Sequence, residues 1–370
     1  MFNLLGRVSL LTVSLLLMST LNAHETGQFT HHTDIGSVKH AGSLSYDQSH
    51  QVYTLAASGA NMWFAEDELH FAWNQMTGDF IVRAQVRFLG EGVDPHRKVG
   101  WHVRESLEAN SAHVLAAVHG DGLTALQFRE RTGANTEEYK LNLQAPDVIQ
   151  LERRGQTFIM SAARMGEPFQ VTQVSHVNLP DQVYVGLALT AHNAEVIERV
   201  ELANVRIILP AAGDFTPYQD YIGSNLEIMD MRTLQRRIVH RAPGSIQAPN
   251  WTHDGKTLIV NGDGLLFNFD IATGEVSTLN TGFANRNNND HVLSWDGKQI
   301  GISHHAEEEQ GRSTIYVLPL MGSDAPRQIT HPGVGHSYLH GFSPDDKTLI
   351  FTADRKGKYD IYAVDIATGA

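Results

Sequence analysis

His291 and His340 occupy matching positions in a repeated segment of the chain. Each lies two residues before a hydrophobic residue, Leu293 or Phe342, that leads into an acidic turn, and Asp290 precedes the first histidine. Neutral imidazole nitrogens and carboxylate oxygens suit Zn²⁺, Mn²⁺ and similar ions. Histidines that hydrogen-bond to the backbone of a neighbouring repeat are the alternative interpretation. We predict ligand binding at Asp290, His291 and His340, metal binding at His291 and His340, and a divalent ion (Mn, Zn or Ca) as the candidate cofactor.

A second group of residues in the first half of the chain has the chemistry of a glycan site. Aromatic rings stack on sugars, and polar side chains bind the hydroxyl groups. The candidate ligand-binding residues here are Trp63, His70, Trp101, His102 and Arg104. Side chains alternate along a strand, so Trp101 lies on one face while His102 and Arg104 lie on the other. A buried Trp101 with outward-facing His102 and Arg104 is the alternative interpretation.

Two further histidine pairs carry a weaker signal. His304 and His305 precede three glutamates, but adjacent side chains on a strand point to opposite faces and cannot easily share one ion. A solvated acidic loop is therefore the expectation for this segment. His31 and His32 lie in a polar segment near the predicted mature N-terminus, where we expect a disordered start rather than a metal site.

The elements that must position His291 and His340 repeat along the last part of the chain. The acidic turns at Gly255, Gly297 and Asp346 are 42 and 49 residues apart, and each is flanked by strand-like hydrophobic segments. A period in the forties with strand–turn–strand content predicts β-propeller blades, whose inner strands line a central channel. Residues 219–370 amount to about three and a half blades at ~40–45 residues per blade. We therefore expect either a fragment of a longer protein or a ring completed by a second copy.

The preceding region, residues 24–209, also reads as strands. Phe80, Val82 and Ala84 alternate with Ile81 and other mostly polar residues, which is typical of a half-buried antiparallel strand. Many short strands separated by turn signals predict a β-sandwich or jelly roll. Residues 210–218 contain two prolines and a glycine and are predicted to be a linker. The predicted fold class is all-β, a jelly-roll sandwich followed by an incomplete propeller.

The composition and the N-terminus limit the classes of function. Residues 1–23 contain Arg7, an apolar run and a small residue at Ala23, the pattern of a secretory signal peptide. The formal charge of −13 and the lack of a basic run argue against nucleic acid as a partner. The chain has no cysteine, which excludes disulfides and thiolate metal sites. We expect a periplasmic or secreted protein that does not span the membrane after signal cleavage.

Two resemblances to known families follow from these motifs. Ser294-Trp-Asp-Gly-Lys298, Ile361-Tyr-Ala-Val-Asp365 and the segments 288–291 and 337–341 resemble the blade repeats of periplasmic TolB-type propellers, over residues 219–370. The segments 59–63, 67–71, 99–104 and 119–122 resemble the concanavalin-like jelly rolls that often precede such propellers. The repeat also loosely resembles the oligogalacturonate lyases, and that resemblance implies three histidines around a manganese ion in the propeller.

These observations leave two functions open. The first is a periplasmic or secreted binding or scaffold protein, whose jelly roll holds a glycan or another cell-envelope component and whose propeller binds a protein partner. The second is a metal-dependent polyuronide lyase with its site at the propeller axis. The sequence has no Gly-x-Ser-x-Gly elbow and no His-Glu-x-x-His motif. Whether the protein is an enzyme stays open, and we favour the binding function.

Overall fold

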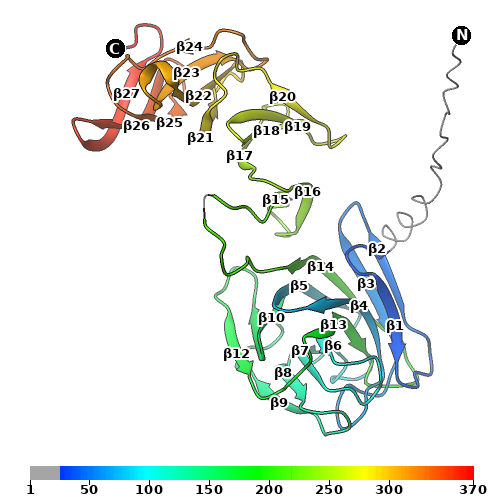
Figure 1. Ribbon diagram of the computed structural model, residues 1–370. Helices are drawn as coiled ribbons and strands as arrows, with labels where there is room; N and C mark the ends of the chain where they lie inside the picture. The colour runs from blue at the N-terminus through cyan, green and yellow to red at the C-terminus, as the bar shows by residue number, and fades with distance from the viewer. Residues whose placement is uncertain (1–25, 218) are drawn as a thin grey trace, which may run out of the picture. The chain divides into compact units, whose positions relative to one another are not determined.

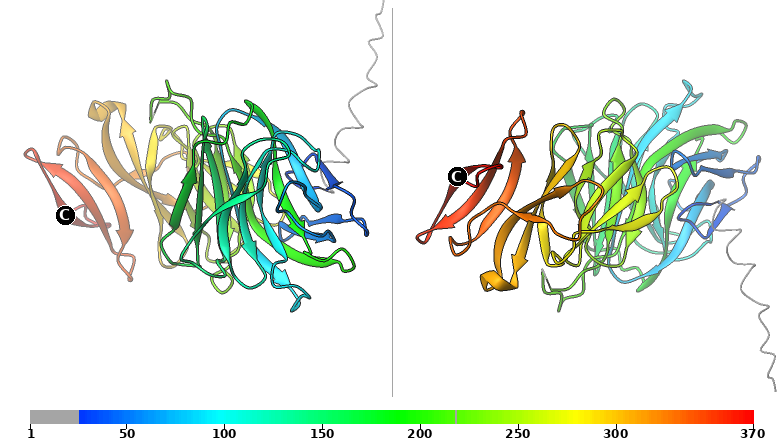
Figure 2. Two further views of the ribbon diagram at one scale, coloured as in Figure 1. Left: turned by 90° about the horizontal axis from the view of Figure 1, so that it is seen from below. Right: turned by 90° about the horizontal axis from the view of Figure 1, so that it is seen from above.

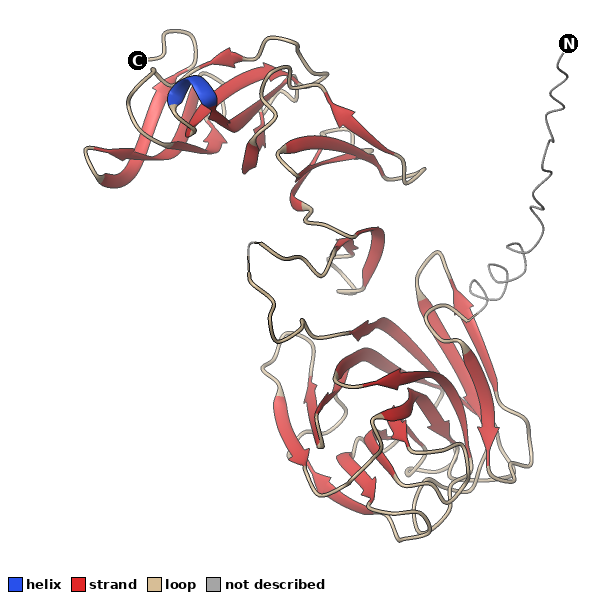
Figure 3. Ribbon diagram, in the orientation of Figure 1, coloured by secondary structure: helices blue, strands red, loops and turns tan. Residues whose placement is uncertain are grey.

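The computed structural model describes residues 26–217 and 219–370. These residues form β-strands and one short 3₁₀ turn, Glu307–Glu309, which confirms the prediction of an all-β fold (Figures 1 and 3). The predicted signal peptide, residues 1–23, lies outside the described residues. The chain divides into two compact units: one runs up to Ala212 and includes Asp230–Arg237, and the other comprises Gly213–Met229 and Ile238–Ala370.

The first unit is a sandwich of two seven-stranded antiparallel sheets. In spatial order, the first sheet contains β1 (His31–Ile35), β4 (Leu69–Thr77), β13 (Gln182–Thr190), β6 (Lys98–Arg104), β7 (His113–His119), β8 (Thr124–Arg129) and β9 (Glu137–Lys140). The second contains β12 (Gln170–Val174), β11 (Thr157–Ala163), β10 (Val148–Arg154), β5 (Phe80–Leu89), β14 (Glu198–Ile208), β3 (Val52–Ala57) and β2 (Ser43–Asp47).

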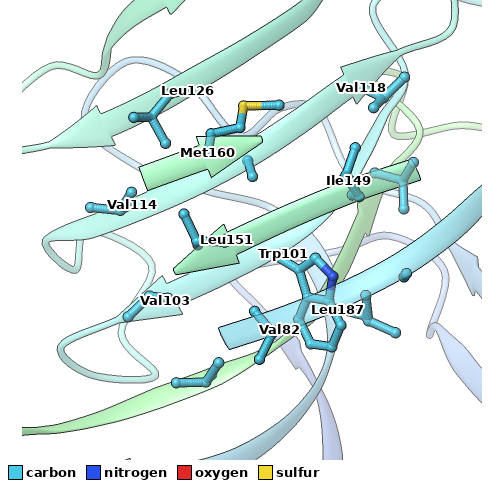
Figure 4. Packing of buried hydrophobic residues seen from close by; sticks show 14 of the residues in the cluster. Val82, Trp101, Val103, Val114, Val118, Leu126, Ile149, Leu151, Met160 and Leu187 are labelled. Carbon is cyan, nitrogen blue, oxygen red and sulfur yellow. The ribbon is translucent and has the colours of Figure 1, made fainter. Parts of the chain in front are cut away.

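The core of this unit lies between the two sheets. Every second residue of each central strand points inward, which is the alternation that the sequence predicts for β5. Figure 4 shows Trp101 among Val82, Leu151 and Leu187, side chains that come from both sheets. All four are fully buried.

The other face of the first sheet is also buried. Residues 60–68, which we call the cover segment, lie over it and place Met62 against Phe71 and Leu115. The cover segment is closed by a bridge between Met62 and Asp67, and the Asp67 N–H donates to the Ala109 carbonyl at 2.9 Å. This face is therefore not open to solvent beneath the segment.

The rest of the chain forms successive small sheets, which Figure 2 shows in green to red. The described residues form a two-stranded sheet of β15 (Ser224–Met229) and β16 (Arg236–Ala242), then a four-stranded sheet of β17 (Gln247–Trp251), β18 (Thr257–Gly262), β19 (Leu265–Asp270) and β20 (Val276–Leu279). Another four-stranded sheet follows with β21 (Asn287–Leu293), β22 (Gln299–Ala306), β23 (Arg312–Pro319) and β24 (Arg327–Gln328). The last sheet has β25 (Ser337–Phe342), β26 (Thr348–Arg355) and β27 (Lys358–Asp365).

These sheets have the arrangement of propeller blades. The inner strand β21 lies next to the inner strands β17 and β25 of its two neighbours. Apolar side chains fill the space between successive sheets, for example Ile259 against Ile300, and Val317 against Leu339. A sheet of this size cannot bury both faces alone, so stacking against its neighbours supplies the core. The predicted fold class, a sandwich followed by propeller blades, is confirmed.

Asp346 links the turns of two neighbouring blades. Its carboxylate accepts hydrogen bonds from the backbone N–H groups of Trp295 at 2.7 Å and Asp296 at 2.9 Å. We expect Asp346→Asn to lower the free energy of unfolding by about 1–2 kcal/mol, because the amide can accept only one of these bonds. Urea unfolding measures the change, and Asp263→Asn makes the same replacement at another residue with positive φ. Equal stabilities of the two variants would contradict the linking role.

Candidate functional site

Asp67 belongs to the cover segment, and its side chain forms the centre of a buried charge cluster between this segment and the sheet. Arg104 Nη1 donates to Asp67 Oδ2 at 2.6 Å, and Arg129 Nη2 donates to Oδ1 at 2.8 Å. His113 Nδ1 lies 3.5 Å from Oδ2, and His102 lies beside His113 with ring centroids 4.7 Å apart. All five side chains are buried. Arg129 also donates to the carbonyls of residues 63 and 64, so the cluster holds the cover segment in place.

Asp67, His102 and His113 are residue types that bind metal ions, but the net charge of their surroundings does not favour a cation. Within the described part of the chain, they form the one group of three such residues whose ligand atoms lie within 4.8 Å of one another. Burial lowers the pKa of His113 to about 4 and that of His102 well below its ordinary value, so both are neutral at pH 7. Arg104 and Arg129 then outweigh Asp67, and a divalent ion would add charge to a buried cluster that is already positive. The cluster is structural.

The structure places the predicted glycan-binding residues of this unit mostly out of reach of a ligand. Trp101 is fully buried in the core, which matches the alternative interpretation. His102 and Arg104 point to the opposite face, as predicted, but the cover segment buries them completely. Trp63 is half-buried in the cover segment, with Lys98 Nζ 5.6 Å from its ring centre. The expectation of an exposed glycan face therefore requires correction at Trp101, His102 and Arg104.

His70 is also buried, but it belongs to a separate polar group. Its Nδ1 lies 2.7 Å from Asp34 Oδ1, and its Nε2 lies 3.1 Å from His32 Nδ1. His32 is part of the ordered strand β1, so the expected disordered start at His31 and His32 is wrong. Strand pairing between β1 and β4 brings these residues together across nearly forty positions of sequence, and no local pattern predicts that contact.

His291 and His340 do not occupy equivalent places in the blades. His291 pairs with Ile302, whereas His340 lies in a β-bulge between Leu339 and Gly341. His291 is buried, and its Nε2 lies 3.3 Å from the Ile259 carbonyl of the preceding blade, as the alternative interpretation predicts. His340 is exposed and its Nε2 lies 3.1 Å from Thr352 Oγ1. The bulge sends the two imidazoles to different surroundings, so they do not fit a shared divalent ion.

Asp290 and His340 lie near a third residue, His305, at the inner end of the blades. Burial raises the pKa of the Asp290 carboxyl, while the nearby His340 and His305 act in the opposite direction. His305 Nδ1 lies 2.9 Å from the Gly311 carbonyl, which can only accept, so this nitrogen carries the proton. The Nε2 atom of a neutral His305 therefore presents a lone pair.

His305 also lines a cleft of about 600 Å³ at the end of one blade, which we call the blade-end cleft. The residues that line it are Phe283, Asn285, Arg286, His304, His305, Glu307 and Glu308. They come from the β20–β21 connection, the last residues of β22 and the β22–β23 connection, which lie at the same end of the blade. The expected solvated acidic loop at His304–Glu309 is thus one wall of a cleft, with Glu309 buried.

An aromatic group that includes Phe283 and His304 borders the blade-end cleft. The Phe283 ring lies 6.2 Å from His304 and 5.5 Å from Tyr316, and 48% of Phe283 is exposed. His304 Nδ1 accepts from the Arg286 backbone N–H at 3.2 Å, so a neutral His304 carries its proton on Nε2. The Tyr316 hydroxyl lies 3.3 Å from Glu308 Oε1. The cleft thus has an exposed ring, an N–H donor, an imidazole acceptor and charged groups of both signs.

Sequence reasoning found His304 and His305 but not their role. It correctly placed the two imidazoles on opposite faces: His304 contacts Phe283 and Tyr316, and His305 contacts His336. Phe283 was missed because it lies in a connection with no periodic pattern. The repeat could have indicated this contact, because it places the β20–β21 connection and the end of β22 at the same end of a blade.

Comparisons with known proteins find similarity to a putative TolB and to a lectin. No family model matches it. It is 42% identical over 148 residues to an uncharacterized protein of Agrobacterium fabrum, covering 40% of this chain and 48% of that one, so it spans about half the length of this curated relative. A putative TolB from Agrobacterium tumefaciens is 41% identical, with a TM-score of 0.36, over 39% of this chain and 50% of that chain. Lectin II from Ulex europaeus is 8% identical, with a TM-score of 0.33, over 49% and 98%.

Among the described residues, the structure has no helix with the length and apolar character needed to cross a membrane.

Proposed function

We propose that this protein is a periplasmic or secreted binding protein that holds a neutral oligosaccharide in the blade-end cleft. The observation that carries the proposal is the partly exposed Phe283 ring, which lies beside His304 in a cleft of about 600 Å³ that His305 also lines. An accessible ring face with fixed donors and acceptors around it is the arrangement that binds sugar rings and hydroxyls. The predicted signal peptide supports the location.

The charges favour a neutral ligand over an acidic one. Glu307 and Glu308 outweigh Arg286 among the residues that line the cleft, and Asp290 lies close to His305. A uronate would meet net negative charge there. The polyuronide lyase is also less well supported because His291 contacts a backbone carbonyl and not His340. A binding role needs neither a metal nor a catalytic base.

Phe283→Ala tests this proposal. Binding of the purified full chain to an array of neutral and acidic oligosaccharides identifies the ligand, and calorimetry then measures its affinity. We expect Phe283→Ala to weaken binding about tenfold or more, because it removes the stacking surface at the centre of the contact. Phe169→Ala is the matched control, since Phe169 is 43% exposed and lies just before β12 in the sandwich. Preference for uronates, or equal affinities of the two variants, would contradict the proposal.

A further inference from the structure

Asp34, His70 and His32 form a linear group at one edge of the sandwich. Asp34 pairs directly with His70 in the β1–β4 register, and His32 pairs with Ala72, two residues further along. All three therefore lie on the same face, with His32 diagonal to His70 and within reach of it. His70 is 2% exposed, whereas His32 is exposed.

The chain makes room for this group at Gly42. A Cβ atom at Gly42 would lie 2.3 Å from His70 Cγ, so only glycine leaves space for the imidazole. The Gly42 N–H also donates to the two Asp34 carboxylate oxygens, at 3.0 and 3.2 Å. Backbone and side chain together fix the Asp34 carboxylate toward His70 Nδ1.

The hydrogen bonds determine which nitrogens carry lone pairs. An ionised Asp34 can only accept, so His70 Nδ1 carries the proton at the 2.7 Å contact. The Nε2 atom of a neutral His70 therefore has a lone pair, and it points to His32 Nδ1 at 3.1 Å. In the absence of an ion, His32 Nδ1 must be the donor of that bond. If His32 instead carries its proton on Nε2, two lone pairs face each other.

The geometry points to a divalent metal site of the zinc class, with His70 Nε2 and His32 Nδ1 as ligands and water completing the coordination. Two nitrogens at ~2.0–2.1 Å from a tetrahedral ion lie about 3.3 Å apart, close to the observed 3.1 Å. A carboxylate that holds the other nitrogen of a ligating histidine is the usual outer-shell partner of such ions. Asp34 supplies that partner to His70.

The charge of this site differs from that of the Asp67 cluster. Asp34 contributes a negative charge and holds the proton of His70 on Nδ1, which leaves Nε2 as the nitrogen that faces the proposed ion. No arginine side chain is hydrogen-bonded or ion-paired to Asp34 among the described residues. The site therefore attracts a cation, while the Asp67 cluster repels one. The exposed position of His32 leaves a path from solvent.

Competition between the full chain and a chromophoric chelator for Zn²⁺ tests this site. Because the chain has 20 histidines, the measurement is the difference between His32→Ala and His31→Ala. His31 is the matched control, since it is exposed and contacts Trp73 on the opposite face. We expect His32→Ala to lose one equivalent of bound Zn²⁺ and His31→Ala to keep it. Asp34→Asn should weaken the same equivalent by about 10–100-fold.

A spectroscopic measurement keeps the test independent of stability. Nitrogen-15 imidazole spectra of the full chain should show His32 Nδ1 changing from protonated to metal-bound when Zn²⁺ is added. The same Zn²⁺ stoichiometry and affinity in wild type, His32→Ala and His31→Ala would overturn the proposal. So would a His32 spectrum that Zn²⁺ leaves unchanged. Neither outcome bears on oligosaccharide binding at the blade-end cleft.

Discussion

Asp67→Asn should lower the free energy of unfolding by about 3–5 kcal/mol, because it leaves two buried guanidinium groups without a counter-charge. Arg104 and Arg129 both have fully buried side chains that donate to this carboxylate. An uncharged amide can accept a hydrogen bond but cannot balance either arginine. Urea unfolding monitored by tryptophan fluorescence measures the loss, and Glu66→Gln, at the exposed neighbouring residue, is the control.

The dependence of this loss on pH provides a second measurement. Burial opposes the shift, but His113, Arg104 and Arg129 hold the pKa of Asp67 well below its ordinary value of 3.8. A lowered carboxyl pKa in the folded state contributes stability above the unfolded pKa, and this contribution is lost as the pH falls through the folded pKa. The difference between wild type and Asp67→Asn should therefore stay constant above about pH 5 and shrink only in acid below the unfolded value. A loss under about 1 kcal/mol would contradict the structural role.

Amide hydrogen exchange of the cover segment tests the same prediction locally. The Asp67 carboxylate and the Arg129 bonds to residues 63 and 64 attach this segment to the sheet. Amide hydrogen exchange in residues 60–68 should accelerate in Asp67→Asn more than exchange in β5, because the attachment is lost before the core opens.

Much of the fold could be predicted from local patterns. The alternation of Phe80, Val82 and Ala84 places these residues in the core because a strand repeats every two residues. The spacing of the acidic turns at Gly255, Gly297 and Asp346 predicted the blades because each repeat is one sheet. In both cases the information lies within a few residues or in a repeat, so sequence alone contains it.

The candidate sites could be predicted only in part because they depend on long-range contacts. Alternation correctly set His102 and Arg104 opposite Trp101, but a segment some forty residues earlier covers them. His291 and His340 match in sequence, yet a one-residue bulge separates their surroundings. A change of one residue in register moves a side chain to the other face of a strand. Sequence spacing does not report such bulges.

Trp101→Ala should also cost about 3–5 kcal/mol, and the loss should appear in unfolding rather than in ligand affinity. Trp101 is fully buried between the two sheets, and its ring centroid lies 6.2 Å from that of Phe29. Alanine would leave a large cavity, because the strands of the two sheets cannot move inward to fill it.

Trp101→Phe separates packing from hydrogen bonding at this position. The Trp101 indole N–H has no hydrogen-bond partner in the described structure, so phenylalanine keeps most of the volume and removes a buried unpaired donor. We expect Trp101→Phe to retain most of the stability that Trp101→Ala loses, with unfolding midpoints measured in urea. If Trp101 instead contacted a sugar, both variants would weaken oligosaccharide binding while the unfolding midpoint stayed near that of the wild type. Because a side chain with no exposed surface cannot stack on a ligand, we expect the first pattern.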